Sequence, residues 1–248
     1  MGSNCEAPHL SRAERKTVTR EVRSALDEAG VTSVPIISGA SDALVRGTLI
    51  YVATLRWLAL TPSSSCHRAI FRFAGRGVFL PAVTAGISMD SDLILEISSH
   101  PNIVGTKFTC GDTGKLALVA SAKSTKTPKS NDGDYLVLGG LADFGLQALV
   151  AGVSGFVGGG ANVLPKTWKH LYDLFNRGNF EMAMKTQAEL SEADWPHTNN
   201  GLAGTKRVLQ KHLGYGGLSR RPLGALSPEV AQSLDAQVQH FMVREAKL

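Results

Sequence analysis

One stretch decides the fold, Ile103-Val104-Gly105-Thr106-Lys107-Phe108-Thr109-Cys110-Gly111-Asp112. Its apolar start predicts a short strand, and the two-residue period of a strand places Ile103, Gly105 and Lys107 on one face. A lysine inside a sheet loses hydration, which favours its neutral and nucleophilic amine. Gly105 is expected to leave room for a small ligand, so Lys107 has the setting to form a Schiff base with a ketone. Taken alone, the stretch favours the alternative, a lysine that marks the return of the strand to solvent.

Strands and helices alternate around this stretch. Further strands are predicted at residues 135–140 and 155–158, and helices at residues 90–97, 112–120 and 144–150. Alternation of this kind indicates a parallel sheet with right-handed crossovers. The length of 248 residues suits a single α/β barrel with an addition.

The pattern changes to helices only from Pro165 onward. An apolar stripe predicts the first of these helices, and three more are expected at residues 180–193, 202–213 and 228–244; the stripe consists of Trp168, Leu171, Tyr172 and Phe175. We therefore predict two regions, a partial barrel over residues 1–164 and a helical region over residues 165–248 that packs on it.

Near the N-terminus, residues 11–29 predict a helix of their own. Ser11 and Glu14 have the spacing of a capping box, and Gly30 suits the position after the last turn. Val18 and Val22 belong to an apolar stripe that we expect to be buried.

Two local features leave alternatives open. Asp143 either orients part of a site or caps the helix that begins at Phe144, and the cap is the preferred interpretation. The run Gly158-Gly159-Gly160 resembles a phosphate-binding loop but lacks the following Lys-Ser/Thr, so close packing at a strand end is preferred.

Composition excludes several classes of protein. The net charge is +5, with Lys and Arg dispersed along the chain, so no nucleic-acid partner is expected. The three cysteines form no CxxC pair and the histidines form no HExxH motif, so no metal site is expected. No apolar run has the length of a membrane span. The predicted location is the cytoplasm, or the mitochondrion if the native N-terminus is longer.

Four motifs together resemble the dihydrodipicolinate synthase and N-acetylneuraminate lyase family of class I aldolases. The Lys107 stretch resembles the Schiff-base strand of that family. The other three resemble its substrate-carboxylate loop, the segment after its fifth strand and the end of its eighth strand; they are Gly2-Ser3-Asn4-Cys5-Glu6, Pro81-Ala82-Val83-Thr84-Ala85-Gly86 and residues 155–165.

The resemblance implies a (β/α)8 TIM barrel with a C-terminal helical region, assembled as a dimer or tetramer. It implies that Lys107 condenses with the keto group of pyruvate or another 2-keto acid, and that the iminium serves as an electron sink. Ser3 and Asn4 match the positions that bind the substrate carboxylate, and Gly140 and Val157 match backbone positions near the keto acid. No organic cofactor is implied, because the lysine performs the covalent chemistry.

The predicted reaction is the cleavage of a 4-hydroxy-2-keto acid to pyruvate and an aldehyde. The run Leu202-Ala203-Gly204-Thr205-Lys206 is most similar to fungal members named 4-hydroxy-2-oxoglutarate aldolase or 2-keto-3-deoxy-sugar-acid aldolase. One alternative is condensation of pyruvate with an aldehyde, as in dihydrodipicolinate synthase. The other alternative is a catalytically impaired family fragment that only associates with other subunits.

Three departures from the family pattern support that last alternative. The sequence starts where the second strand of the family has ended, so the barrel is expected to be incomplete, without its first two strands. Val78 occupies the position of the tyrosine that relays protons in the family. Residues 48–80 are shorter than the corresponding family segment and differ from it in sequence.

Overall fold

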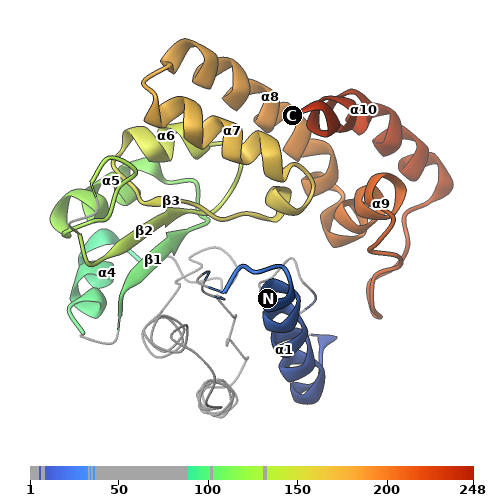
Figure 1. Cartoon of the computed structure of the whole chain (residues 1–248), viewed down its shortest axis with the longest axis horizontal. Helices are drawn as coiled ribbons and strands as arrows, with labels where there is room; N and C mark the ends of the chain where they lie inside the picture. The colour runs from blue at the N-terminus through green and yellow to red at the C-terminus, as the bar shows by residue number, and fades with distance from the viewer. Residues whose placement is uncertain are drawn as a thin grey trace. The chain divides into compact units, whose positions relative to one another are not determined.

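The computed structural model describes residues 6, 9–32, 34, 36, 89–100, 103–130 and 133–248. The chain divides into two compact units. One comprises residues 1–77 and 101–104, and the other comprises residues 78–100 and 105–248. Within the second unit, Figure 1 shows three strands side by side with helices against them, followed by a wholly helical region.

In the first unit, the predicted N-terminal helix is confirmed as α1 (Arg12–Glu28). Ser11 is its N-cap, and both hydrogen bonds of the capping box to Glu14 form. The prediction that its apolar stripe is buried, however, is wrong, because Val18 is 38% and Val22 44% exposed. The apolar spacing made the helix amphipathic, but in this structure the stripe stays largely uncovered.

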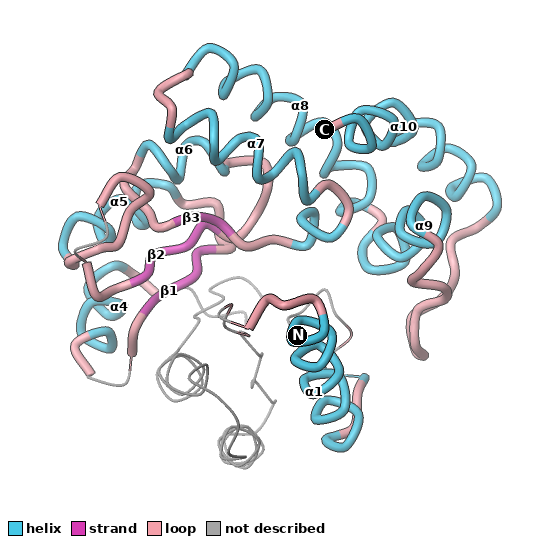
Figure 2. Tube along the Cα trace, in the orientation of Figure 1, coloured by secondary structure: helices cyan, strands magenta, loops and turns pink. Residues whose placement is uncertain are grey.

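The second unit is built on a parallel three-stranded sheet in the order β1-β2-β3, formed by β1 (Gly105–Phe108), β2 (Leu136–Gly139) and β3 (Gly155–Phe156). All three lie within or next to the predicted strands. Figure 2 shows that a helix lies between each strand and the next along the chain. The predicted alternation and parallel pairing are therefore confirmed over the described strands.

Three helices flank the sheet: α4 (Ser91–Ser98), α5 (Thr113–Ala122) and α6 (Gly145–Val150). The side chain of Asp112 caps α5 by accepting from the Lys115 N–H at 2.8 Å. The preferred cap role of Asp143 is wrong, because α6 has Phe144 as N-cap and no side-chain cap hydrogen bond. The side chain of Gln187 accepts a hydrogen bond from the first turn of α6 instead, as described below.

The sheet buries the face opposite Lys107. Phe108 is 2% exposed and Val137 is fully buried. On the same face, a Cβ at Gly139 would lie 3.2 Å from the Cβ of Ala148, so α6 packs directly on the backbone of β2. This tight packing fixes the orientation of the strands and leaves the other face for the site.

The expected role of Gly105 is corrected by the sheet. A Cβ there would lie 2.5 Å from the Leu136 carbonyl oxygen and 2.9 Å from the Leu136 Cβ. The missing side chain thus allows the close approach of β2 rather than opening space for a ligand.

The helical region contains α7 (Pro165–Asn176), α8 (Phe180–Asn199), α9 (Gly201–Leu213) and α10 (Pro228–Lys247). The predicted stripe of α7 is buried at Trp168, Leu171 and Phe175. Helix α8 runs six residues beyond its predicted end, with Pro196 inside it.

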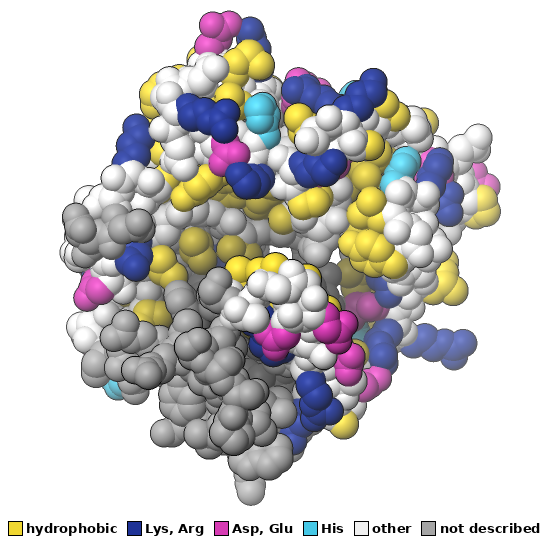
Figure 3. Space-filling view, in the orientation of Figure 1, with side chains coloured by type: hydrophobic (Ala, Val, Ile, Leu, Met, Phe, Trp, Pro, Cys, Tyr) yellow, Lys and Arg dark blue, Asp and Glu magenta, His cyan; other side chains and the backbone are white. Residues whose placement is uncertain are grey.

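The surface drawn in Figure 3 carries Lys and Arg side chains spread over several elements, with Asp and Glu among them. None of the helices in the described ranges is long and apolar enough to cross a membrane.

Candidate active site

The register of the sheet defines a row of residues that share a face with Lys107. Lys107 is paired with Leu138, and Leu138 with Gly155. Paired residues of parallel strands point to the same side, and alternation brings every second residue to that side. Continued one step past the last paired residues, this alternation predicts that the next row on the Lys107 face contains Thr109, Gly140 and Val157. On that extension, three of the predicted site residues share one face.

Lys107 itself is half-buried in β1. Its neighbour Thr106 is 1% exposed and points to the opposite face, where its hydroxyl is 2.5 Å from the Tyr135 hydroxyl. Burial raises the pKa of Tyr135, so this phenol stays neutral as a structural hydrogen-bonding group. The hydrogen bond ties the residue before Lys107 to the packed face of the sheet.

Gly140 marks the closest approach of two strand ends. A Cβ at Gly140 would lie 2.5 Å from the Phe108 carbonyl oxygen and 2.6 Å from the Cα of Thr109. Only glycine fits there without a backbone shift. The Val157 N–H donates to the Gly139 carbonyl at 2.8 Å, and its side chain is 44% exposed. Backbone from β2 and β3 therefore borders the face that carries Lys107.

Thr109 is a residue of this face that the sequence did not single out. Its Oγ1 is buried and has no hydrogen-bond partner in the structure as described. A buried hydroxyl without a partner is costly and marks a position where a ligand group can complete the bonding. The available signal was its spacing, two residues after Lys107 on a continuing extended segment.

The glycine run after β3 serves close packing, as preferred. A Cβ at Gly158 would lie 2.6 Å from Cη2 of Trp168, and one at Gly160 would collide with Oδ1 of Asp194. Residues Gly159–Asn162 form a single turn of 3-10 helix, η3. The backbone at the end of β3 is therefore pressed against side chains of α7 and α8.

Asp143 lies in the loop that follows β2. Burial raises the pKa of Asp143, and the carboxylate of Asp194 raises it further. The two acids, from a strand-end loop and from α8, are thus close enough for their charges to interact.

The predicted carboxylate-binding residues Ser3 and Asn4 lie outside the described residues, as do Cys5 and Val78. Within the described ranges, no three His, Cys, Asp or Glu side chains gather as metal ligands. A pocket of about 370 Å³ lies among α7, α9 and α10, and its lining includes no residue of the sheet.

A half-buried lysine on a parallel strand, beside backbone from two more strand ends, has the groups needed to bind a small ketone covalently and hold it. The parallel strands and the helices between them make this a βα protein. The chain belongs to the Dihydrodipicolinate synthetase family, whose model matches residues 79–241.

Two fungal relatives support that assignment. The chain is 43% identical to an L-threo-3-deoxy-hexylosonate aldolase of Aspergillus niger, covering 100% of this chain and 85% of the relative. It is 37% identical to a protein of Emericella nidulans named "Probable 4-hydroxy-2-oxoglutarate aldolase, mitochondrial", covering 94% of this chain and 80% of the relative.

Among solved structures, a dihydrodipicolinate synthase family protein of Coccidioides immitis is 25% identical, with a TM-score of 0.77. The match covers 100% of this chain and 84% of that chain. The family implies a (β/α)8 barrel, and the described helices and parallel sheet are consistent with a part of one.

Proposed function

We propose that the chain is a class I aldolase that cleaves a 4-hydroxy-2-keto acid to pyruvate and an aldehyde. The observation that carries the proposal is the row geometry, which sets Lys107 on the same face as Thr109, Gly140 and Val157. The names of two relatives, both aldolases, favour a carbon–carbon lyase. The Aspergillus niger relative favours a 3-deoxy-hexylosonate as the substrate.

The chemistry assigns Lys107 as the nucleophile. Its neutral amine adds to the keto carbon C2, and loss of water gives an iminium. A base removes the proton of the C4 hydroxyl, the C3–C4 bond breaks, and its electron pair moves into the iminium to give an enamine. The aldehyde leaves, the enamine takes a proton at C3, and hydrolysis by water releases pyruvate and restores the amine.

The other predicted site residues bind rather than react. Ser3 and Asn4 hold the substrate carboxylate, and backbone at Gly140 and Val157 borders the keto acid. The unpartnered Thr109 hydroxyl is the described group on this face that suits a hydrogen bond to the C4 hydroxyl. No organic cofactor or metal takes part in this proposal.

Several further predictions from the sequence belong with the proposal. The division into residues 1–164 and 165–248, a dimeric or tetrameric assembly, and the lack of nucleic-acid and membrane partners are retained. A cytoplasmic location is retained beside the mitochondrial one, which the name of the Emericella nidulans relative favours.

The test is pyruvate release from two candidate substrates, L-threo-3-deoxy-hexylosonate and 4-hydroxy-2-oxoglutarate, followed by coupled reduction of pyruvate. We expect release from the hexylosonate at the higher kcat/KM. Consumption of pyruvate with an aldehyde, without release from either acid, would support the dihydrodipicolinate synthase-type condensation instead. A folded sample that does neither, and co-elutes with subunits of a full-length relative, would support the non-catalytic alternative.

A further inference from the structure

Helix α8 carries a polar stripe, buried at two of its four residues, that the proposed chemistry does not use. Gln187, Ser191, Asp194 and Thr198 follow one another at spacings of four, three and four residues, which places them on one face of the helix. We call these four residues the α8 stripe. Gln187 and Asp194 are 5% and 7% exposed. Polar groups buried to this degree need partners, and their partners are the loops after β2 and β3.

The loop after β2 is held by Gln187. Its side-chain oxygen accepts from the Leu146 N–H at 2.7 Å, which is one of the open N–H groups of α6. Its side-chain amide donates to the Ala142 carbonyl at 2.8 Å. Ser191 adds a donated hydrogen bond to the Asp143 carbonyl at 3.3 Å. Together they fix residues 142–146, which begin two residues after Gly140.

The loop after β3 rests on Asp194. Oδ1 of Asp194 lies where a Cβ of Gly160 would be, so carboxylate and backbone are in direct contact. Thr198 donates to Oδ2 at 3.0 Å, and Nε2 of His197 lies 3.4 Å from Oδ1 without hydrogen-bond geometry.

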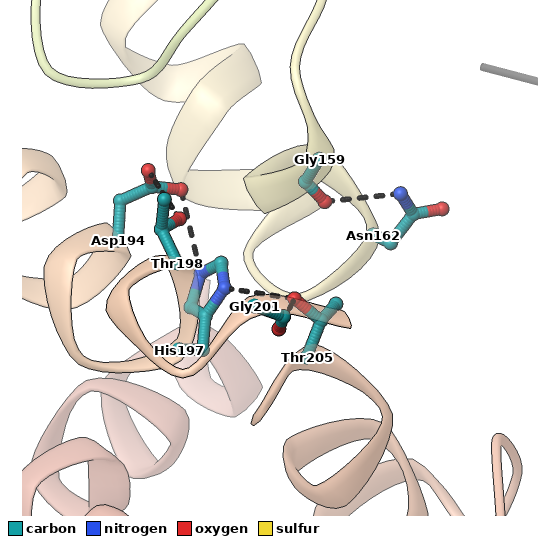
Figure 4. A network of polar contacts seen from close by, with 7 residues as sticks. All are labelled: Gly159, Asn162, Asp194, His197, Thr198, Gly201 and Thr205. Carbon is teal, nitrogen blue, oxygen red and sulfur yellow. Dashed lines mark hydrogen bonds and ion pairs between the residues drawn. The ribbon is translucent and has the colours of Figure 1, made fainter. Parts of the chain in front are cut away.

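Figure 4 shows the His197 ring between Asp194 and Thr205 of α9. Nδ1 of His197 is 3.2 Å from the Thr205 hydroxyl. The carboxylate that lies against η3 is therefore held by Thr198 of its own helix, and the His197 ring beside it is held by Thr205 of α9.

We propose that the α8 stripe is a positioning element for the aldol site, which sets the backbone at the ends of β2 and β3 without touching the substrate. This inference rests on the proposed function, because it assumes that Gly140 and Val157 border the bound keto acid. The stripe acts on both loops from one rigid helix, so it fixes their spacing as well as their individual places. A misplacement of about 1 Å at such a site can lower a rate by about 10²-fold.

The test compares Gln187→Met and Asp194→Asn with the wild-type chain. Gln187→Met nearly keeps side-chain volume and removes the hydrogen bonds to the loop after β2. Asp194→Asn keeps side-chain volume and removes the negative charge of the group that lies against Gly160. The matched control is Glu192→Gln, an exposed acid on the same helix. Each variant is assayed for borohydride-dependent attachment of pyruvate to Lys107, for KM and kcat of cleavage, and for its melting temperature. We expect both stripe variants to attach pyruvate only at raised concentration, with kcat/KM about 10- to 100-fold lower, and the control to match the wild type.

The outcomes separate the two proposals. No attachment of pyruvate to the wild-type chain would reject the proposed function itself. Attachment in the wild type, with unchanged KM and kcat per folded stripe variant and only a lower melting temperature, would make the stripe merely structural and overturn this inference. If a stripe variant does not fold, Ser191→Ala removes one half-buried hydroxyl only, and a raised KM is expected there too; an unchanged KM in that folded variant would overturn the inference as well.

Discussion

The sheet and the helical region solve the burial of polar groups in opposite ways. The sheet brings backbone together through glycines, as at Gly105 and Gly140, and has few buried side-chain hydrogen bonds. The helical region buries the charged or polar side chains of Gln187, Asp235 and Glu245 and gives each several partners. Under the two proposals, the sheet carries the nucleophile Lys107, and the helices fix the positions of the loops around it.

The largest effect should come from the sheet. Lys107→Ala removes the amine that we propose forms the Schiff base, so we expect kcat to fall by about 10⁴-fold or more while the melting temperature changes little. Lys169→Ala, an exposed lysine paired with Asp173 on α7, is the control and should retain full activity. Cleavage at wild-type rates by the Lys107 variant would show that Lys107 is not the nucleophile. The proposed difference in role between the sheet and the helical region would then be wrong.

The next effect should come from the helical region, in stability rather than chemistry. Glu245 of α10 accepts from the N–H groups of Lys166 and Thr167 at 2.6 and 2.9 Å, and from the Thr167 hydroxyl at 2.6 Å. Since Leu164 offers no side-chain cap, Glu245 caps α7 from a distance. Glu245→Ala should lower the free energy of unfolding by about 1.5–3 kcal/mol, measured by urea titration.

The control for that experiment is Glu245→Gln, which keeps an acceptor oxygen and should lose less. Equal unfolding midpoints for wild type and Glu245→Ala would show that the cap contributes nothing.

A smaller effect concerns pH. Burial acts to raise the pKa of Asp235, but hydrogen bonds from Arg207 and Lys211 outweigh it, so the pKa lies below its ordinary value of 3.8. A carboxyl group whose pKa is lower in the folded than in the unfolded state stabilises the fold at any pH above its unfolded pKa. This stabilisation is lost as the pH falls through the folded pKa. Asp235→Asn should therefore cost stability at pH 7, and the difference from wild type should shrink in acid below the ordinary pKa. A difference that grows on acidification would contradict the ion-pair account.

The smallest effect should come from an exposed pair of the same region. On α8, Nζ of Lys185 lies 2.7 Å from Oε1 of Glu181. Their side chains are 61% and 76% exposed, so solvent screens the attraction between the two charges. Glu181→Gln should change the free energy of unfolding by less than about 0.5 kcal/mol. A loss as large as that of Glu245→Ala would mean that burial does not decide which polar contacts matter here.

Local patterns predicted those parts of the fold whose causes are local. The caps at Ser11 and Asp112 depend on residues three apart, and the parallel strands follow from short apolar runs between helices. Likewise, the two-residue period was enough to put Lys107 and Gly105 on one face.

The remaining features depend on contacts between distant residues. Gly105 makes room for β2, the cap of α6 comes from Gln187 on α8, and the cap of α7 comes from Glu245 on α10. The row that joins Thr109 to Gly140 and Val157 requires the register of three strands, which no single stretch contains. Site residues and supporting residues were therefore visible in the sequence only where one motif carried them.

The assignment of Lys107 as the nucleophile is tested most directly by treating the chain with pyruvate and borohydride and then identifying the modified peptide by mass spectrometry. Borohydride reduces an iminium to a stable amine, so we expect a pyruvyl adduct on Lys107 and no adduct in Lys107→Ala. A folded sample without an adduct, or with the adduct on another lysine, would contradict the assignment of Lys107 as the Schiff-base nucleophile.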